Sequence, residues 1–175
     1  GHHAIYAPNL TGNLDQLRRE LRIVRDEGVA AVMMAPMIVG LAAFHQIVKE
    51  AAGVAVMAHP AMAGAARIAP PLLLGKLFRL FGADITVFPN YGGRFAYSEQ
   101  SCRELAKAAL GPADGMKRCL PAPAGGLTLA RVPELIEFYG RDVLLLIGGS
   151  LLAARERLTE ETALFVSKVE SHGRT

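Results

Sequence analysis

Six short apolar runs, each separated from the next by a longer stretch, constrain the fold of this 175-residue chain more than any other feature. They are rich in Val, Ile, Leu, Met and Ala and lack polar alternation, as expected for parallel strands buried on both faces. The six runs cover His3–Ala7, Val29–Ala35, Val54–Ala58, Asp84–Pro89, Lys117–Ala122 and Val143–Ile147. Their regular recurrence predicts a repeating strand-and-helix architecture.

The stretches between the runs have helical periodicity. In Asn13–Glu27, the residues Leu14, Leu17, Leu21 and Val24 fall on one helical face. The same pattern predicts helices over Leu72–Phe81, Ser98–Leu110, Leu129–Tyr139 and Thr159–Val169. Strands that alternate with helices six times predict an α/β protein with a parallel sheet.

Composition excludes several classes of protein. Hydrophobic residues make up 51% of the chain, which is enough for a core, and nothing in residues 1–175 divides it into more than one domain. The net charge of +3 is scattered, so a nucleic-acid partner is not expected. No apolar run reaches the about 20 residues of a membrane span. Two cysteines make no disulfide framework, which predicts a cytoplasmic protein.

Two architectures fit six strand-helix units: an open doubly wound sheet and a (β/α)8 TIM barrel. A nucleotide-binding wound sheet favours a glycine-rich fingerprint after the first strand, and Ala7–Gly12 does not have one. A barrel needs eight units and this chain supplies six. The second alternative therefore predicts an incomplete barrel.

Paired glycines follow the last two predicted strands, as Gly125-Gly126 and Gly148-Gly149. In a barrel, phosphate often binds at the loops after strands seven and eight, and glycine pairs let backbone N–H groups approach an anion closely. The alternative is that both pairs are tight turns. The pairs are candidate substrate-binding residues for a phosphate.

Two other side chains are candidates for chemistry at the same edge. His59 follows the third predicted strand, where it would either exchange protons or form a hydrogen bond within the barrel mouth. Arg94 lies in a loop with Gly92-Gly93, where it would either cover an anionic substrate or remain a surface arginine. No cluster of His, Cys, Asp or Glu has metal-ligand spacing, so no metal-binding residue is predicted.

Together, six segments of the chain resemble the large-subunit family of RuBisCO, and its RuBisCO-like (form IV) branch more than the true carboxylases. The segments are Ala58–Gly64, Leu72–Leu77, Gly82–Asp84, Phe88–Phe95, Leu120–Gly126 and Leu146–Gly149. The resemblance covers essentially the whole chain and implies that its strands are barrel strands three to eight. It places the N-terminal domain and the first two barrel strands before Gly1.

The resemblance also implies roles for individual residues. His59 matches a histidine used in proton transfer, and Arg94 lies where carboxylases have a loop lysine that stabilises the carboxylated intermediate. Gly125, Gly126, Gly148 and Gly149 match the backbone cradle of one substrate phosphate.

Departures from the carboxylase pattern concern the second phosphate. Three groups that help to hold it in carboxylases are replaced here by Pro60, Val87 and Ala124. The resemblance therefore implies a phosphorylated small-molecule substrate with one phosphate, and no carboxylation.

Enzymes of this branch enolise phosphorylated sugar-derived substrates, as isomerases, enolases or decarboxylases (lyases). The resemblance implies a Mg²⁺ cofactor whose ligands are not in this chain, so the isolated chain is expected to be inactive. A non-catalytic binding or regulatory role is the alternative. An incomplete barrel exposes strand edges, which predicts a homo-oligomer or association with the missing N-terminal part.

Overall fold

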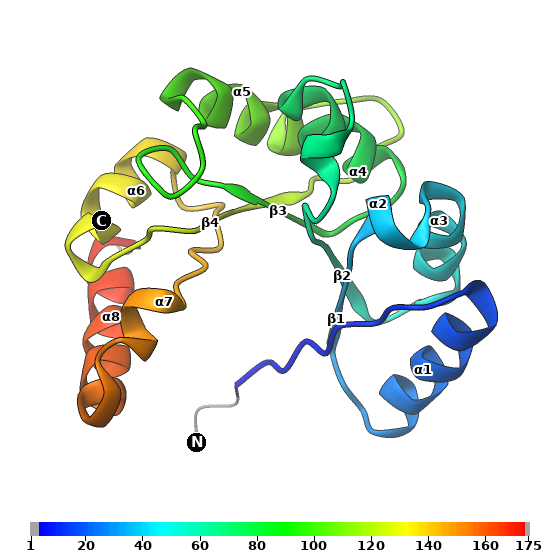
Figure 1. Ribbon diagram of the computed structural model, residues 1–175, viewed down its shortest axis with the longest axis horizontal. Helices are drawn as coiled ribbons and strands as arrows, with labels where there is room; N and C mark the ends of the chain where they lie inside the picture. Colours follow the sequence, from blue (N-terminus) through cyan, green and yellow to red (C-terminus); the bar gives the residue numbers. More distant parts are fainter. Residues whose placement is uncertain (1–3, 174–175) are drawn as a thin grey trace.

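The computed structural model describes residues 4–173 as a curved parallel sheet with helices on its outer side (Figure 1). Strands β1 (Ala31–Met34), β2 (Ala55–Ala58), β3 (Ile85–Pro89) and β4 (Leu120–Ala124) lie in chain order, and each pair is parallel. A doubly wound sheet reverses its strand order and carries helices on both faces, whereas a barrel keeps its strands in sequence. The prediction of an α/β, barrel-type and incomplete sheet is therefore confirmed.

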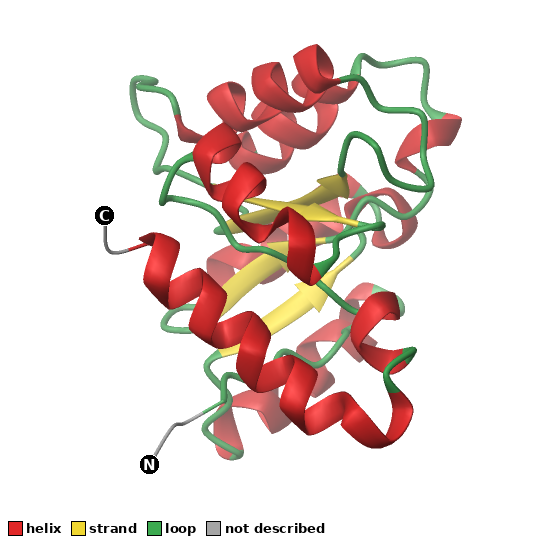
Figure 2. Ribbon diagram, turned by 90° about the vertical axis from the view of Figure 1, so that its left-hand side faces the viewer, coloured by secondary structure: helices red, strands yellow, loops and turns green. Residues whose placement is uncertain are grey.

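Helices pack against the convex side of the sheet, and the predicted ones are present. In Figure 2 the strands run behind the long helix α8. The helical elements are α1 (Leu14–Asp26), α2 (Pro36–Val39), α3 (Leu41–Glu50), η1 (Ala63–Ala65), the π-helical η2 (Pro71–Leu77), α4 (Phe78–Leu80), α5 (Glu99–Leu110), η3 (Leu129–Arg131), α6 (Val132–Tyr139), α7 (Gly149–Leu152), η4 (Arg155–Arg157) and α8 (Leu158–Gly173). In α1 the predicted face is buried through Leu17, Leu21 and Val24.

The first predicted strand lies later in the chain than expected. The residues that form hydrogen bonds with β1 are Pro8 and Leu10. Met33 N–H donates to the Pro8 carbonyl, and Leu10 N–H donates to the Met33 carbonyl, both at 2.8 Å. A single parallel bridge joins Asn9 to β1, so the expected boundaries are wrong over the described part of the run. Residue His3 of that prediction lies outside the described residues.

The fifth predicted strand also begins late, at Leu120 rather than Lys117. Lys117 and Arg118 are ion-paired instead, with Asp84 and Asp142, at 2.6 Å each. These charged pairs lie at the amino edge of the sheet, before the ladder with β3 starts.

The sixth predicted run forms no strand, and the prolines of β4 explain why. Leu144 and Leu146 donate their N–H groups to the carbonyls of Pro121 and Pro123, at 3.0 and 3.2 Å. Because a strand residue directs its N–H and C=O to the same neighbour in a parallel ladder, both prolines lack the donor that this side of β4 needs. Only one isolated bridge therefore joins the run Val143–Ile147 to β4.

The two faces of the sheet differ in exposure. The row Met34–Ala58–Thr86 faces the helices and is completely buried. The neighbouring row points to the concave side and is partly exposed; it consists of Met33, Met57, Ile85 and Leu120, the last of which is 40% exposed. The concave face is thus an open apolar surface.

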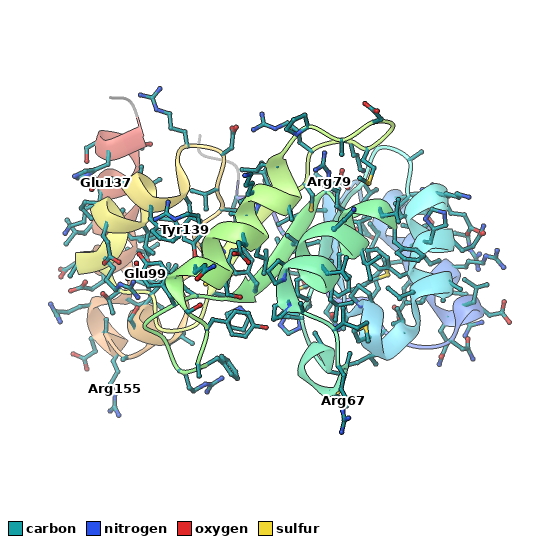
Figure 3. The ribbon with its side chains drawn as sticks, turned by 90° about the horizontal axis from the view of Figure 1, so that it is seen from above. Arg67, Arg79, Glu99, Glu137, Tyr139 and Arg155 are labelled. Atoms are coloured by element: carbon teal, nitrogen blue, oxygen red, sulfur yellow. The ribbon has the colours of Figure 1, made fainter. Side chains whose placement is uncertain are left out.

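A buried arginine fixes the connection that leads into β4. Arg79, 4% exposed, donates to the backbone carbonyls of Ala108, Gly111, Met116 and Lys117 at 2.6 to 3.2 Å. Figure 3 shows Arg79 beside the turn that follows α5. This side chain is satisfied by backbone alone, which is a structural role.

Candidate functional site

Two adjoining cavities open at the carboxyl edge of the sheet, where the loops after β2, β3 and β4 meet. The first, of about 560 Å³, is lined by His59, Pro60, Ala61, Met62, Ala63, Gly64, Ala65, Val87, Phe88, Pro89, Arg94, Phe95, Tyr97, Ala124 and Gly125. The second, of about 380 Å³, is lined by Gly125, Gly126, Leu127, Thr128, Leu146, Gly148, Gly149 and Ser150. The cavities share Gly125. All six predicted site residues therefore lie at one edge, and their roles stay predictions.

His59 is held by the loop that it begins. Its N–H donates to the Met34 carbonyl at 2.7 Å, and its Nδ1 accepts the Ala61 N–H at 3.1 Å. Because a backbone N–H can only donate, the neutral ring carries its proton on Nε2. Burial lowers the pKa of His59 below its usual value of 6.5. The imidazole is therefore neutral at pH 7 and offers an Nε2–H donor.

The loop after β2 is apolar apart from His59. Met62 adopts a left-handed backbone (φ 63°), which is uncommon for a residue with a side chain, and its side chain is 61% exposed. Pro60 and Ala61 line the same part of the first cavity, where no charged side chain is present besides Arg94 across from them. This half of the cavity suits an uncharged, apolar group.

Arg94 lies at the exposed tip of the loop after β3, residues 90–97. Its guanidinium stacks on the Phe95 ring, 5.1 Å from the centroid, and the Phe95 side chain is 49% exposed. Arg94 makes no ion pair in the described part of the chain. A cation at the mouth of the first cavity is thus available to an anionic ligand.

The glycines after β4 form a sharp turn on which the β3 loop rests. Gly125 and Gly126 have φ values of +79° and +78°. A Cβ on Gly93 would lie 2.3 Å from the Gly125 carbonyl oxygen, and one on Gly126 would lie 2.6 Å from the Gly93 Cα. Close backbone contact between the two loops therefore requires glycine, whatever the turn binds.

Buried polar side chains fix the base of the β3 loop, and sequence reasoning missed them. Asn90 is 0% exposed; its Oδ1 accepts the Tyr139 hydroxyl at 2.6 Å and its Nδ2 donates to the Tyr91 carbonyl at 3.1 Å. Figure 3 shows Tyr139 between α6 and α5. A polar pair directly after an apolar strand, Asn90-Tyr91, is the sequence feature that could have indicated them.

Tyr91 makes further contacts with the segment that follows the glycine turn, three of them with Glu134 and Arg131. Its hydroxyl donates to Glu134 Oε1 at 2.5 Å, its carbonyl accepts from Arg131 Nη1 at 3.0 Å, and Arg131 stacks on its ring at 4.8 Å. Burial and the carboxylate raise the pKa of Tyr91 to about 12. Hydrogen bonds from Arg131 and Tyr91 lower the pKa of Glu134 to about 2. The phenol is neutral and the carboxylate is ionised near neutral pH.

The side chains of residues 4–173 form no ligand set for a metal ion. No group of three or more His, Cys, Asp or Glu side chains in this range is arranged to hold one. Asp84 lies at the opposite edge, where Oδ2 accepts the Val56 N–H at 2.8 Å. The described side chains therefore supply no ligands for the Mg²⁺ that the family resemblance implies, and the Mg²⁺ cofactor stays a prediction.

None of the helices in residues 4–173 has the length and apolar composition needed to cross a membrane.

Comparisons with known proteins support the resemblance. No protein-family model matches the chain. It is 61% identical over 173 residues, 99% of its length, to ribulose bisphosphate carboxylase-like protein 1 of Rhodopseudomonas palustris. It is 57% identical over 169 residues, 97% of its length, to 5-methylthioribulose-1-phosphate isomerase of Rhodospirillum rubrum. The chain spans about half of these relatives, 47% and 45% of their respective lengths.

A solved structure agrees with the sequence relationship. The crystal structure of a RuBisCO-like protein from Rhodopseudomonas palustris superposes with a TM-score of 0.89 at 62% identity, over 97% of this chain and 46% of that one. Both the sequence and the arrangement of strands and helices therefore lead to one family. Over the part of the fold that it spans, the chain belongs to the RuBisCO-like branch of the RuBisCO large-subunit family.

Proposed function

We propose that the chain forms the phosphate- and carbonyl-binding part of an enzyme that enolises a phosphorylated, sugar-derived ketone. The observation that carries this proposal is the pair of cavities that share Gly125, one lined by both glycine pairs and the other by His59 and Arg94. The substrate class has one phosphate and an apolar opposite end. Carboxylation of a bisphosphate is not part of the proposal.

The phosphate would bind in the second cavity. Gly125, Gly126, Gly148 and Gly149 bring side-chain-free backbone to its wall, so amide N–H groups can approach phosphate oxygens at short range. Arg94, at the mouth of the neighbouring cavity, adds a positive charge that suits the same anion.

The apolar half of the first cavity supports a substrate whose other end carries no second phosphate. The positions Pro60, Val87 and Ala124 all line it and offer no donor side chain for an anion. The R. rubrum relative is named for 5-methylthioribulose 1-phosphate, which has one phosphate and a methylthio end. We therefore propose this compound as the first substrate to test.

His59 would act on the oxygen of the substrate carbonyl. With its proton on Nε2, the neutral imidazole donates a hydrogen bond to the carbonyl oxygen and stabilises the charge that develops there on enolisation. No Asp, Glu or Lys lines the first cavity, so the group that removes the carbon-bound proton is not among its lining residues.

The missing proton acceptor favours a second candidate function, which is binding without turnover. A Mg²⁺ ion would supply further stabilisation of an enediolate in the parent family. The described side chains hold no ligand set for this ion.

Solvent exchange distinguishes the two functions. Because the chain spans about half of its relatives, a full-length protein that contains it is incubated in D₂O with 5-methylthioribulose 1-phosphate, and loss of the protons on the carbons beside the carbonyl is followed by NMR. An enolising protein exchanges them, and His59→Asn slows the exchange by about 10²-fold or more. Binding by calorimetry without exchange would support the non-catalytic role, and absence of binding would overturn both.

Association would cover the concave face of the sheet. The partly exposed row Met33, Met57, Ile85 and Leu120 supports a homo-oligomer or a complex with a further part of the protein. Analytical ultracentrifugation tests this at micromolar concentration, and a stable monomer would contradict it.

A further inference from the structure

Loop 90–97 is exposed at its tip yet fixed at its base. Arg94 and Phe95 are exposed, whereas Asn90 and Tyr91 are 0% and 7% exposed. The loop lies between the two cavities, because Gly93 rests on the glycine turn Gly125-Gly126. The position of the Arg94 guanidinium therefore depends on how this base is held.

Three side chains hold the base through a closed set of contacts. Glu134 accepts from Arg131 through both carboxylate oxygens, at 3.0 and 2.8 Å, and accepts the Tyr91 hydroxyl at 2.5 Å. Arg131 in turn donates to the Tyr91 carbonyl at 3.0 Å and covers its ring. Each of the three residues thus contacts the other two.

The set joins the two loops that carry the candidate ligand groups. Arg131 ends η3 and Glu134 lies in the first turn of α6, so both belong to the segment that continues from the glycine turn. Tyr91 belongs to the loop that carries Arg94. The same two loops are therefore held together twice, by the backbone contact at Gly93 and by the side-chain contacts among Tyr91, Arg131 and Glu134.

Stability alone does not account for the arrangement. The Arg131 and Glu134 side chains are 20% and 49% exposed, and ion pairs of this exposure contribute little to the free energy of unfolding. A bidentate pair that also bonds a loop carbonyl does, however, restrict geometry strongly. We therefore expect the Arg131–Glu134 pair to restrict the conformation of the loop rather than to stabilise the fold.

We propose that Tyr91, Arg131 and Glu134 form a clamp that positions loop 90–97, and with it Arg94, beside the glycine turn. The clamp residues are positioning residues: they contact the loop and not the ligand. The consequence for ligand binding depends on the proposed function, whereas the restriction of the loop does not.

Trypsin provides a direct test because Arg94 is itself a cleavage site at the loop tip. Cleavage after Arg94 needs the loop to open locally, whereas cleavage after the buried Arg79 needs the core to open. Mass spectrometry follows both cuts in one digest. We expect Arg131→Gln and Tyr91→Phe to speed cleavage after Arg94 by about tenfold, with cleavage after Arg79 unchanged.

Arg103→Gln is the matched control. Arg103 stacks on Phe138 at 4.1 Å, and Phe138 contacts the Tyr91 ring, but Arg103 makes no hydrogen bond to the described part of loop 90–97. Its loss should leave cleavage after Arg94 as it is. Equal rates for Arg131→Gln, Arg103→Gln and the unchanged protein would overturn the clamp. If a variant opens the core, so that Arg79 is cut, Glu134→Gln takes its place.

Binding of inorganic phosphate, measured by calorimetry, tests positioning. The clamp variants should raise its dissociation constant several-fold, and Arg103→Gln should not. A loop that opens while phosphate binds unchanged would overturn the positioning role. An unchanged protein that binds no phosphate would instead contradict the proposed function, and the trypsin rates would still decide whether the clamp exists.

Discussion

The loops after β2 and β3 form opposite walls of one cavity but are held in different ways. The loop after β2, His59–Ala66, is shaped by its backbone: a left-handed Met62, a turn of 3-10 helix and a hydrogen bond from Ala61 N–H to His59. The loop after β3 is fixed by buried polar side chains, Asn90 and Tyr91, which bond to α6 and its first turn.

The difference follows from what each loop presents. His59 lies at the end of a strand, and one hydrogen bond from the Ala61 N–H is enough to fix its proton on Nε2. Arg94 lies at an exposed tip, and a long cationic side chain loses considerable rotamer freedom when it is held in place. Holding this exposed tip requires anchors from a neighbouring element, and the β3 loop has them in α6.

The largest difference that we expect between the two loops is the stability lost when a glycine is substituted. Gly126→Ala places a Cβ 2.6 Å from the Gly93 Cα at a left-handed position, so we expect a loss of about 2–4 kcal/mol in the free energy of unfolding. Gly64→Ala, in the loop after β2, is the control because a Cβ there meets nothing within 4 Å. Denaturant unfolding measures both, and equal losses would show that the seam between the loops is not close-packed.

Removing one buried hydroxyl should have the next largest effect. Tyr139→Phe leaves the buried Asn90 Oδ1 without its donor, at a cost of about 1–3 kcal/mol. Tyr97→Phe removes a hydroxyl that makes no hydrogen bond in the described structure, and it should change the unfolding free energy little. A comparable loss in both variants would mean that ring packing, and not the Asn90 bond, holds the loop base.

Replacing Met62, the left-handed residue of the loop after β2, should raise the free energy of unfolding. Met62→Asn places a residue that tolerates left-handed backbone at φ 63°, and little apolar burial is lost from a side chain that is 61% exposed. We expect a gain of about 0.5 kcal/mol. Arg155→Asn, at φ 50° outside the site, should give a similar gain. A loss at Met62 alone would indicate that its side chain packs within the cavity.

The smallest effect expected is a pH dependence from His59. Because burial lowers its pKa below 6.5, the unfolded chain binds this proton more readily than the folded one. The free energy of unfolding should therefore fall as the pH drops below about 6.5, and His59→Gln should reduce the slope. Thermal melts at a series of pH values measure it, and an unchanged slope would place the ring in water.

Much of this arrangement follows from local sequence pattern. The apolar runs located β1, β2 and β3, and glycines after strands located the cavity edge. The clamp could not be predicted from local pattern, because Tyr91 and Glu134 are 43 positions apart in the sequence. They come into contact only because β3 and β4 are neighbours in the sheet. The absence of a strand over the sixth run, Val143–Ile147, could not be predicted either, because hydropathy does not show that Pro121 and Pro123 lack N–H donors on the side of β4 where they are needed.

Those two prolines also weaken the backbone bonding at the boundary beside β4. Across β3 and β4 the backbone exchanges hydrogen bonds in both directions. Between β4 and residues 144–146, all of which the structure describes, the backbone donors are Leu144 and Leu146, and β4 donates none in return. Residues 144–173, with α7 and α8, therefore form a unit that is held to the rest of the fold less by backbone hydrogen bonds than by side-chain contacts, including the packing of α8 against α6. Gly148 and Gly149 belong to that unit, while Gly125 and Gly126 do not. A ligand that contacts both glycine pairs would therefore link the two sides of this weakly bonded boundary and stabilise it by binding.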